Sequence, residues 1–368
     1  MSKTQPLRVG LIGANGRWGP RAHVPALTQL PETELYAVCT AHADTAQAAA
    51  DKFGVKRAYG DDRSLHADPA VEAALIAVRV PVHYALAKNA LEAGKHVYCE
   101  WPLGANTQEA EALAGLARRM NVHTMVGLQR RASPAYLHLR ELVDNGYVGQ
   151  VLSVNLTQFG SGVLTRTADR TWQRDVTLGA NTFTIWFGHA IDALCMVVGE
   201  LTEVSARIST QVPQWFERDT KRFVDVTSPD NIMIAGRLET GAVVNAHVAH
   251  QPYHGSGYRL EIYGKEGTLA MIGGGDAGEE SKRKVLGGRK DDAALTELPV
   301  PERFKWVPDA LRSAGAAYDV GQMWVRFAEA IRSGTAVEPD FNLAVRRHRM
   351  LDAIRRASET GERQQIPG

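Results

Sequence analysis

The sequence predicts an α/β protein of two domains, with a doubly wound parallel sheet first and an α+β domain built on an open, mainly antiparallel sheet second. Three observations predict this fold. The 368 residues exceed the usual size of a single hydrophobic core. Short apolar runs alternate with Ala-rich helical segments up to residue 127. Longer runs of alternating polarity then follow from residue 151 onward.

The first domain is expected over residues 1–129 as a series of β–α units. Continuously apolar runs are typical of strands that are buried on both faces of a parallel sheet. We therefore expect strands at 7–13, 34–40, 73–78, 96–99 and 123–127. Helical spacing predicts helices between them at 22–30, 45–53, 84–93 and 108–120.

The second domain is expected over residues 130–368. A bridging helix at 134–145 leads into it, and alternating polarity predicts strands at 151–159, 201–212, 232–238, 243–250 and 259–263. One helical stretch, 183–198, interrupts these strands. The segment 273–292, which is rich in glycine and charge, predicts a mobile surface hairpin. Amphipathic helices are expected at 318–332 and 342–360, and we expect the region 318–360 to pack back on the first domain.

Composition and charge exclude several classes of protein. A hydrophobic content of 44% with 23% charged residues is typical of a globular chain, and a formal charge of +1 provides no field for holding nucleic acid. The apolar stretches 73–82 and 193–198 are shorter than a membrane span, and residues 1–6 resemble no leader. Cys39, Cys99 and Cys195 are too scattered for a disulfide framework. We expect a cytoplasmic protein with buried thiols and no membrane contact.

The turn after the first predicted strand has the features of a dinucleotide-binding loop. The strand runs into Gly13-Ala14-Asn15-Gly16-Arg17-Trp18-Gly19, and a helix begins soon afterwards. Small residues let main-chain N–H groups and the helix N-terminus approach a pyrophosphate. The spacing is GxxGxxG, with Asn15 at the second glycine position of GxGxxG, and asparagine tolerates positive φ. We expect a Rossmann domain in which residues 13–18 contact the cofactor; a plain tight turn is the alternative.

The end of the second predicted strand bears on which dinucleotide binds. NAD-binding sheets usually place Asp or Glu there to accept hydrogen bonds from the adenosine ribose. Residues 38–43 contain no acid, and a carboxylate would repel the 2′-phosphate of NADP. Thr40 and His42 can donate to that phosphate, although no arginine is present. This segment favours NADP, with NAD as the alternative; a solvent-exposed His42 without a ligand is equally compatible with the sequence.

With these features, the sequence resembles the glucose-fructose oxidoreductase, inositol dehydrogenase and rhizopine-catabolism oxidoreductase family. The likeness is carried by the opening strand and loop and by residues 81–83, 90–97, 100–102, 148–151, 188–192 and 260–269. It implies an NAD(P)-dependent oxidoreductase that acts on a CH–OH group of a sugar, cyclitol or similar hydroxylated small molecule. It also implies a homodimer or homotetramer paired through the C-terminal sheet.

Three short segments resemble one branch of that family more closely. Residues 14–16, Glu100-Trp101 and Asn181-Thr182 are similar to the branch that contains the yeast galactose-regulon repressor and its bacterial relatives. That repressor binds a nicotinamide dinucleotide and regulates transcription through protein contacts. The resemblance therefore leaves a second interpretation open, a dinucleotide-sensing regulatory protein without turnover.

Two proton-handling residues that the family implies are replaced. Family dehydrogenases carry Glu-Lys-Pro after the fifth strand, whereas this chain carries Trp101 at the lysine position. Lys95 precedes the strand and is expected at the opposite edge of the sheet. A family Asp lies four residues before a His on a helix, but here Ile185 precedes His189. Because imidazole transfers protons near neutral pH, we expect His189 to be the acid/base; a structural histidine is the alternative.

Further polar and aromatic residues are candidates for ligand contact. The resemblance places Pro81, His83, Glu100 and Trp101 near the nicotinamide half of the cofactor. The candidate substrate residues are Arg130, Trp172, Arg174, Asn181 and Asp192. Arg130 can bind an anionic or polyhydroxylated group, and Trp172 and Arg174 precede a glycine turn. Asp192 lies on the same helix face as His189. A surface ion pair and an ordinary core tryptophan are the alternatives for Arg130 and Trp172.

Three histidines in the second domain do not predict a metal site. His247 and His250 lie three apart on an expected strand and therefore point to opposite faces, and no acid or cysteine completes a ligand set with His254. We expect no metal. His250, Tyr253 or His254 can instead line a substrate cleft.

Overall fold

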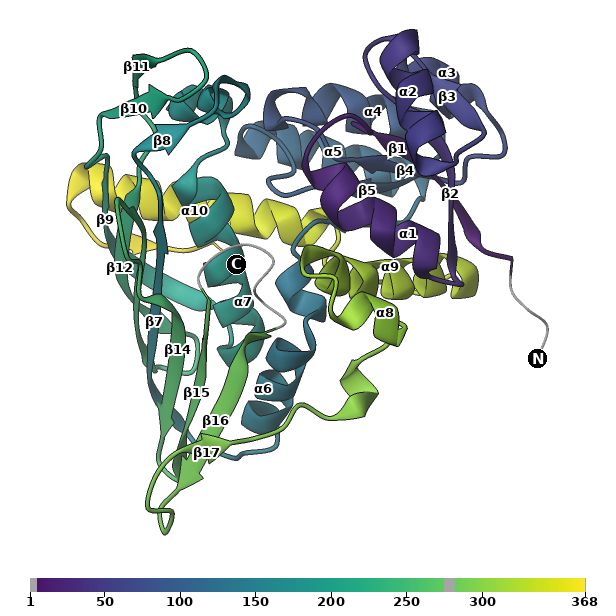
Figure 1. The fold of residues 1–368 in the computed structure, drawn as a ribbon. Coiled ribbons are helices and arrows are strands. Elements are labelled where there is room, and N and C mark those ends of the chain that lie inside the picture. The colour runs from purple at the N-terminus through teal and green to yellow at the C-terminus, as the bar shows by residue number, and fades with distance from the viewer. Residues whose placement is uncertain (1–4, 275–281, 368) are drawn as a thin grey trace. The chain divides into compact units, whose positions relative to one another are not determined.

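The computed structural model describes residues 5–274 and 282–367 and divides the chain into two compact units (Figure 1). Unit 1 comprises Met1–Ala132 and Lys305–Val345, and unit 2 comprises Ser133–Phe304 and Arg346–Gly368. The chain leaves the first unit at residue 132, three residues beyond the domain end expected from the sequence, and then re-enters it at 305. No helix in the described part of the chain is both long and apolar enough to cross a bilayer.

Unit 1 is built on a parallel six-stranded sheet in the order β3-β2-β1-β4-β5-β6. Its strands are β1 Leu7–Ile12, β2 Thr33–Cys39, β3 Arg57–Tyr59, β4 Ala73–Ile76, β5 His96–Cys99 and β6 Thr124–Val126. Because the strand order reverses between β1 and β4, the carboxyl end of β1 is the point at which such sheets bind ligands. The predicted Rossmann fold is confirmed.

Helices connect these strands: α1 Val24–Gln29, α2 Ala43–Phe53, α3 Asp62–Ala67, α4 His83–Glu92 and α5 Thr107–Met120. Their ends carry the expected signals. The Asn106 side chain accepts from the Glu109 N–H to cap α5, and Gly54 ends α2 with φ +69°. The sequence prediction missed β3 and α3, because an exposed three-residue edge strand shows no apolar run.

The last part of unit 1 completes its core. Residues 305–345 contribute α8 Asp309–Arg312 and α9 Ala316–Ser333, and α9 packs against α1. The fully buried Trp324 of α9 stacks on Tyr98 of β5, with ring centroids 4.8 Å apart, and Phe327 joins them. These aromatic contacts add to the hydrophobic burial that attaches α9 to the sheet.

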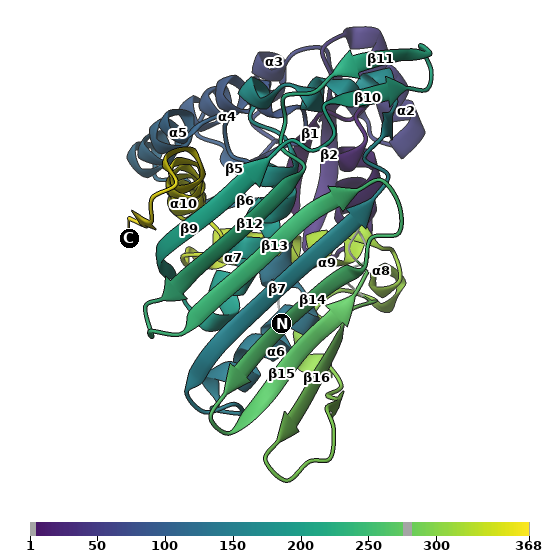
Figure 2. The same cartoon turned by 90° about the vertical axis from the view of Figure 1, so that its left-hand side faces the viewer.

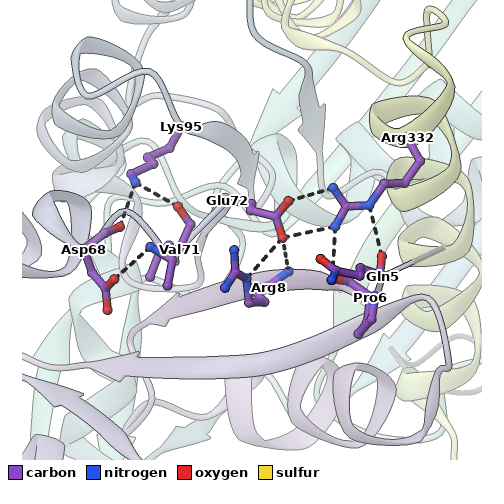
Figure 3. Close-up of polar contacts among 9 residues, drawn as sticks. Gln5, Pro6, Arg8, Asp68, Val71, Glu72, Lys95 and Arg332 are labelled. Carbon is purple, nitrogen blue, oxygen red and sulfur yellow. Dashed lines mark hydrogen bonds and ion pairs between the residues drawn. The ribbon is translucent and has the colours of Figure 1, made fainter.

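Ion pairs and hydrogen bonds of charged side chains join the segments at the amino edge of the same sheet (Figure 3). Arg332 donates to both carboxylate oxygens of Glu72 at 2.6 and 3.0 Å, and the main-chain N–H of Arg8 donates to Glu72 at 3.0 Å. The Lys95 ammonium donates to the carbonyls of Asp68 and Val71 at 2.9 and 2.8 Å. Lys95 therefore lies at the amino edge of the sheet, directly before β5, as predicted, and away from the carboxyl ends of β1 and β5.

Unit 2 is built on a nine-stranded mixed sheet in the order β17-β16-β15-β14-β7-β13-β12-β9-β18. Its strands are β7 Val151–Ser161, β9 Leu201–Ser209, β12 Asn231–Leu238, β13 Val243–Gln251, β14 Gly257–Gly264, β15 Gly267–Gly273, β16 Lys284–Arg289, β17 Thr296–Glu297 and β18 Gln364–Gln365. Only β7 and β13 pair in parallel among the described strands of this sheet. The predicted mainly antiparallel α+β domain is confirmed.

One face of this sheet is covered by helices and the other is not. The helices α6 Pro134–Asp144 and α7 Gly188–Val198 pack on the covered side, where Ile232 and Ile234 are buried. Figure 2 looks onto the opposite face, in front of which no described helix of unit 2 lies. Met233 and Val243 are exposed there, at 47% and 58%.

Two smaller features complete unit 2. A three-stranded sheet contains β11 Arg222–Asp225, β10 Gln214–Glu217 and β8 Thr165–Arg166. A long helix, α10 Phe341–Thr360, begins in unit 1 and continues in unit 2. The hairpin predicted over 273–292 is partly wrong, because β16 pairs with β15 as a regular strand of the large sheet. Part of that segment, 275–281, lies outside the described residues.

Candidate functional site

The loop after β1 is shaped by closely packed glycines, of which Gly13 has no room for a side chain. Gly13 has φ +97°, and a Cβ there would lie 2.5 Å from the Ala77 carbonyl oxygen. Added Cβ atoms on Gly16 and Gly19 would lie 3.1 and 3.3 Å from the Gly13 carbonyl oxygen. A π-helical turn, Gly19–His23, leads on into α1. The loop thus brings bare backbone to the carboxyl end of β1, which is the form that fits a pyrophosphate.

Several main-chain amides of this loop are nevertheless used inside the protein. The N–H groups of Gly13 and Ala14 donate to the Cys39 carbonyl at 2.9 and 3.3 Å, and that of Gly16 donates to the Gly13 carbonyl at 2.9 Å. The first two amides hold the loop against β2, and the third closes the loop on itself, so none of the three is left for a ligand. Asn15, Gly16 and Arg17 are the exposed members of the loop. A phosphate would therefore be contacted by residues 15–19 and the start of the helical turn.

The turn after β2 differs from the expectation in one respect. Thr40 is buried, and its hydroxyl lies 2.8 Å from the His42 carbonyl oxygen and 2.6 Å from the Thr45 hydroxyl. It therefore holds the turn and is not presented to a 2′-phosphate. His42 is exposed. Asp44 stands in the first turn of α2, just beyond the acid-free segment 38–43, and its carboxylate accepts from the Thr45 N–H at 2.8 Å.

A buried chain of hydrogen bonds fixes Glu100 at the carboxyl end of β5. Trp324 Nε1 donates to His23 Nδ1 at 2.9 Å, and His23 Nε2 lies 2.7 Å from Glu100 Oε1. Because an indole N–H only donates, Nδ1 must be the acceptor. The proton of a neutral His23 is then on Nε2, which donates to the carboxylate. His23 and Trp324 are fully buried, whereas the Glu100 side chain is 13% exposed.

This chain of contacts was not predicted from the sequence. His23 and Trp324 are 301 residues apart, and neither belongs to a motif that signals the pairing. Gly127, after β6, makes room for the Glu100 carboxylate, since a Cβ there would come within 2.7 Å of it. The contact with His23 and the space left by Gly127 therefore fit the Glu100 side chain in the orientation observed.

The other residues expected near the nicotinamide are found at the same sheet edge. Trp101 is 4% exposed and follows Glu100 directly. Pro81 is exposed in the turn Val80–Val82 before α4. His83 is buried, with Nδ1 2.8 Å from the Pro102 carbonyl oxygen and Nε2 3.2 Å from that of Val78. Burial lowers the pKa of His83, and a neutral ring can donate to only one of these two carbonyls; both of its nitrogens nevertheless face main-chain oxygens of the protein rather than a ligand.

Candidate substrate residues fall in both units. Arg130 is 4% exposed in the turn Gln129–Ala132 of unit 1. In unit 2, Arg174 is exposed and donates to the Asp225 carbonyl at 3.0 Å, and Trp172 is half-buried in the turn Ala168–Arg174. His189 is half-buried in the first turn of α7, next to the buried Gly188.

Two of these candidates are committed to internal contacts. The Asn181 side-chain oxygen Oδ1 accepts from the N–H groups of Phe183 and Thr184, at 3.0 and 3.1 Å, and caps the helical turn that leads into α7. Asp192 is fully buried and accepts from Arg347 Nε at 2.8 Å. Arg347 also donates to both carboxylate oxygens of Glu200 at 2.7 Å. Asn181 and Asp192 thus support the fold around His189 and offer no open polar atom in these contacts.

The histidines of β13 make separate contacts. His247 Nε2 lies 2.7 Å from the Asn231 side-chain oxygen, whereas His250 Nδ1 lies 3.1 Å from the Thr182 hydroxyl. Within the described ranges, no three His, Cys, Asp or Glu side chains gather in a way that could hold a metal ion.

Comparison with known proteins identifies both halves of the chain. Residues 7–128 match the model of an oxidoreductase family with an NAD-binding Rossmann fold, and residues 134–273 match that of the Gal80p C-terminal domain. Dehydrogenase aclE of Aspergillus oryzae is 32% identical over 375 residues, which cover 97% of each chain. Galactose/lactose metabolism regulatory protein GAL80 of Kluyveromyces lactis is 29% identical over 65% of this chain and 57% of its own.

Solved structures agree with this assignment at the level of the fold. Levoglucosan dehydrogenase in complex with NADH and L-sorbose superposes with a TM-score of 0.83 at 23% identity, over 99% of this chain and all of the other. An oxidoreductase domain protein from Kribbella flavida gives 0.84 at 26% identity, over 99% of this chain and all of the other. The chain therefore belongs to the oxidoreductase family with an NAD-binding Rossmann fold, in the form that carries a Gal80p-like C-terminal domain.

Proposed function

We propose that this protein is an NAD(P)-dependent oxidoreductase that acts on a CH–OH group of a sugar, cyclitol or similar hydroxylated small molecule. The observation that carries the proposal is the glycine loop at the end of β1, where an added Cβ would meet backbone at 2.5 to 3.3 Å. Its relatives include dehydrogenase aclE and levoglucosan dehydrogenase. A bound nicotinamide dinucleotide would supply the hydride chemistry.

In unit 1, the proposed roles follow from where each side chain is held. Gly16 and Gly19 would lie against the pyrophosphate, since nothing larger than hydrogen projects from them, whereas the buried Gly13 shapes the turn that carries them. Glu100, oriented by His23, would accept hydrogen bonds from hydroxyl groups of the cofactor. Trp101 carries no proton that it could exchange at neutral pH, so it would shape the site rather than act as an acid.

In unit 2, we assign proton transfer to His189. Oxidation of an alcohol releases a hydroxyl proton as the hydride departs, and imidazole can accept it near neutral pH. Asn181 and the Asp192–Arg347 pair stabilise the two ends of the segment that carries His189, so buried contacts hold the backbone on which its side chain stands. His189→Ala is expected to lower kcat by a factor of ~10² to 10⁴ while leaving dinucleotide affinity unchanged.

For the cofactor, the described contacts move the proposal from NADP toward NAD. The Thr40 hydroxyl is engaged within the turn, so of the two donors predicted for a 2′-phosphate only the exposed His42 remains. The Asp44 carboxylate stands in the first turn of α2 and would repel that phosphate. Asp44→Ala is expected to raise the affinity for NADP several-fold relative to that for NAD, as measured by calorimetry.

A regulatory function is the second candidate, and one observation favours it. Trp101 and Ile185 stand at positions where the resemblance implies a lysine and an aspartate, and GAL80 regulatory proteins are among the relatives. A dinucleotide sensor needs the glycine loop but no proton-transfer group. Tight cofactor binding without turnover of any sugar or cyclitol in a panel, and a partner that co-purifies only with cofactor, would favour the sensor.

The primary experiment measures binding of NADH and NADPH by calorimetry, followed by a substrate panel read by nicotinamide absorbance. Gly16→Ala places a methyl group 3.1 Å from the Gly13 carbonyl and is expected to weaken binding at least tenfold. Gly115→Ala is the matched control, because its Cβ would meet only the ends of arginine side chains at 3.5 Å or more. Well-folded protein that binds neither dinucleotide would refute both candidate functions.

A further inference from the structure

A cluster of basic side chains lies at one edge of the large sheet in unit 2. The parallel strands β7 and β13 end together there, with His250 opposite Gly160 in the register. The chain continues beside β13, where the N–H groups of Gly162 and Val163 donate to the carbonyls of Pro252 and Gln251 at 3.3 Å. It then forms β8, which ends at Arg166, and the turn that contains Arg170. We call Arg166, Arg170 and His250 the basic cluster.

Arg166 has no acidic partner in this cluster. Its Nη1 donates to the carbonyls of Gly162 and Thr165 at 3.0 and 3.4 Å, and its guanidinium lies 4.9 Å from the centre of the Trp215 ring. Its Nε is buried and has no hydrogen-bond partner. Arg222 on the neighbouring β11 is different, because it donates to the Glu217 carboxylate at 2.6 Å. Because the Nε atom is enclosed by protein, an anion would be bound by the terminal N–H groups of this half-buried guanidinium.

His250 provides the second wall of the cluster. Its ring centre lies 3.7 Å from that of Trp186, and its Nδ1 lies 3.1 Å from the Thr182 hydroxyl. Gly160 makes this packing possible, because a Cβ there would come within 2.4 Å of the Trp186 ring. If the Thr182 hydroxyl donates to Nδ1, the proton of the neutral ring is on Nε2, which becomes another donor. Thr182 and Trp186 belong to the helical turn that leads into α7 and His189.

Positive charge predominates within the cluster. Two carboxylates lie nearby and are engaged elsewhere: Glu217, opposite Arg166 in the β8–β10 register, accepts from Arg222 and Thr171, and Asp219 accepts from the Ala168 N–H. Burial lowers the pKa of Arg166 to about 10, and the nearby Arg170 contributes in the same direction. Burial likewise lowers the pKa of His250 to about 3, with Arg166 and Arg170 adding to the effect. The charges that shift these two groups are all positive. Like charges held together at reduced dielectric are unfavourable, and a bound anion would relieve that repulsion.

We propose that the basic cluster binds a carboxylate or phosphate group of the substrate, so that the protein acts on an acidic sugar derivative rather than on a neutral polyol. Arg166 presents N–H groups in the planar arrangement that suits such anions, and Arg170 adds a second positive charge. The identification of the ligand as substrate rests on the proposed function. The anion site itself rests on the contacts of unit 2 alone.

The test compares binding of D-gluconate, D-glucose 6-phosphate and D-glucose to the full chain with NADH present, by calorimetry. At least one of the two anions is expected to bind tenfold or more tightly than glucose, and the preferred one distinguishes carboxylate from phosphate. Arg166→Gln is expected to reduce that affinity about 10- to 100-fold, which is the value of a charge-assisted contact. Arg218→Gln is the matched control, because it removes an exposed positive charge that follows the neighbouring strand β10.

Equal affinity for all three probes would overturn the proposal. Equal losses of anion affinity in R166Q and R218Q would also overturn it, because they would indicate general charge attraction. The melting temperature of each variant reports folding. If R166Q does not fold, R170Q removes the other guanidinium without disturbing the contact with Trp215 and must show a similar loss. Anion binding that persists in protein unable to bind a dinucleotide would retain the site and refute the proposed function. Turnover of neutral sugars that R166Q does not change would support the proposed function and refute the proposal of an acidic substrate.

Discussion

Replacing His23 with leucine tests the buried chain that fixes Glu100. The substitution leaves the Trp324 N–H buried without an acceptor, which costs about 1–3 kcal/mol. It also removes the donor to the Glu100 carboxylate, which contributes about 1.5–3 kcal/mol. The free energy of unfolding is therefore expected to fall by about 2.5–6 kcal/mol, measured by urea denaturation with an unchanged m-value.

A double-mutant cycle separates the two contributions. Trp324→Phe alone leaves His23 Nδ1 without its donor but keeps the contact with Glu100. In the pair His23→Leu with Trp324→Phe, no indole N–H is left unsatisfied, so the double variant is expected to be more stable than the sum of the single losses by about 1–3 kcal/mol. Dinucleotide affinity should fall in both variants that lack His23 and much less in Trp324→Phe. Additive losses, or a His23→Leu variant within about 1 kcal/mol of wild type, would show that the hydrogen-bond chain is not what holds Glu100.

Three further predictions concern other parts of the molecule. Arg347→Met leaves Asp192 buried without its cation and is expected to destabilise the protein by about 3–5 kcal/mol in urea denaturation, whereas Arg363→Met, at the exposed pair with Glu203, should cost less than about 1. Burial alone would raise the pKa of Glu72, but hydrogen bonds and charge from Arg332 and Arg8 lower it to about 2. Because the pKa of Glu72 is lowered in the folded state, the stabilisation by its carboxylate is present above pH ~4.5 and is lost as the pH falls toward 2. After screening by solvent, this stabilisation amounts to about 1 kcal/mol. Glu72→Gln should remove that part of the pH dependence of the free energy of unfolding. If the chain forms the homo-oligomer that the family resemblance implies, Val243→Glu on the uncovered sheet face is expected to dissociate it, as measured by light scattering. Val176→Glu is the control, because Val176 is exposed outside that sheet. A mass unchanged by Val243→Glu would place any oligomer contact elsewhere.

Most of the fold could be predicted because buried strands leave a strong signal. Continuous apolar runs gave β1, β2, β4 and β5 within two residues of their observed ends. Where that signal is absent, the prediction failed. The edge strand β3 is partly exposed, and β16 contains Gly287 and Gly288, so its pairing with β15 was not visible in the pattern.

Some features of the candidate site depend on residues that are neighbours in the sequence, and others depend on residues far along the chain. The glycine loop and the position of Lys95 follow from neighbours in the sequence, because the strand direction decides at which sheet edge a residue lies. The orientation of Glu100 depends on Trp324, far along the chain, and no local pattern contains that information. Residue type alone also cannot show whether a polar atom is already used. Thr40, Asn181 and Asp192 are all suited to ligand contact, yet each is engaged within the protein.

The two units divide the proposed work, and this division makes the assignments separable. The glycine loop, Asp44 and the His23–Glu100 contact all belong to unit 1, so substitutions there should change dinucleotide affinity. His189 and the basic cluster belong to unit 2, so substitutions there should change turnover or substrate affinity while leaving dinucleotide affinity intact. A folded Arg166→Gln variant that binds NADH tenfold more weakly would break this division. The basic cluster would then have to serve a phosphate of the cofactor, and the substrate would no longer need to be acidic.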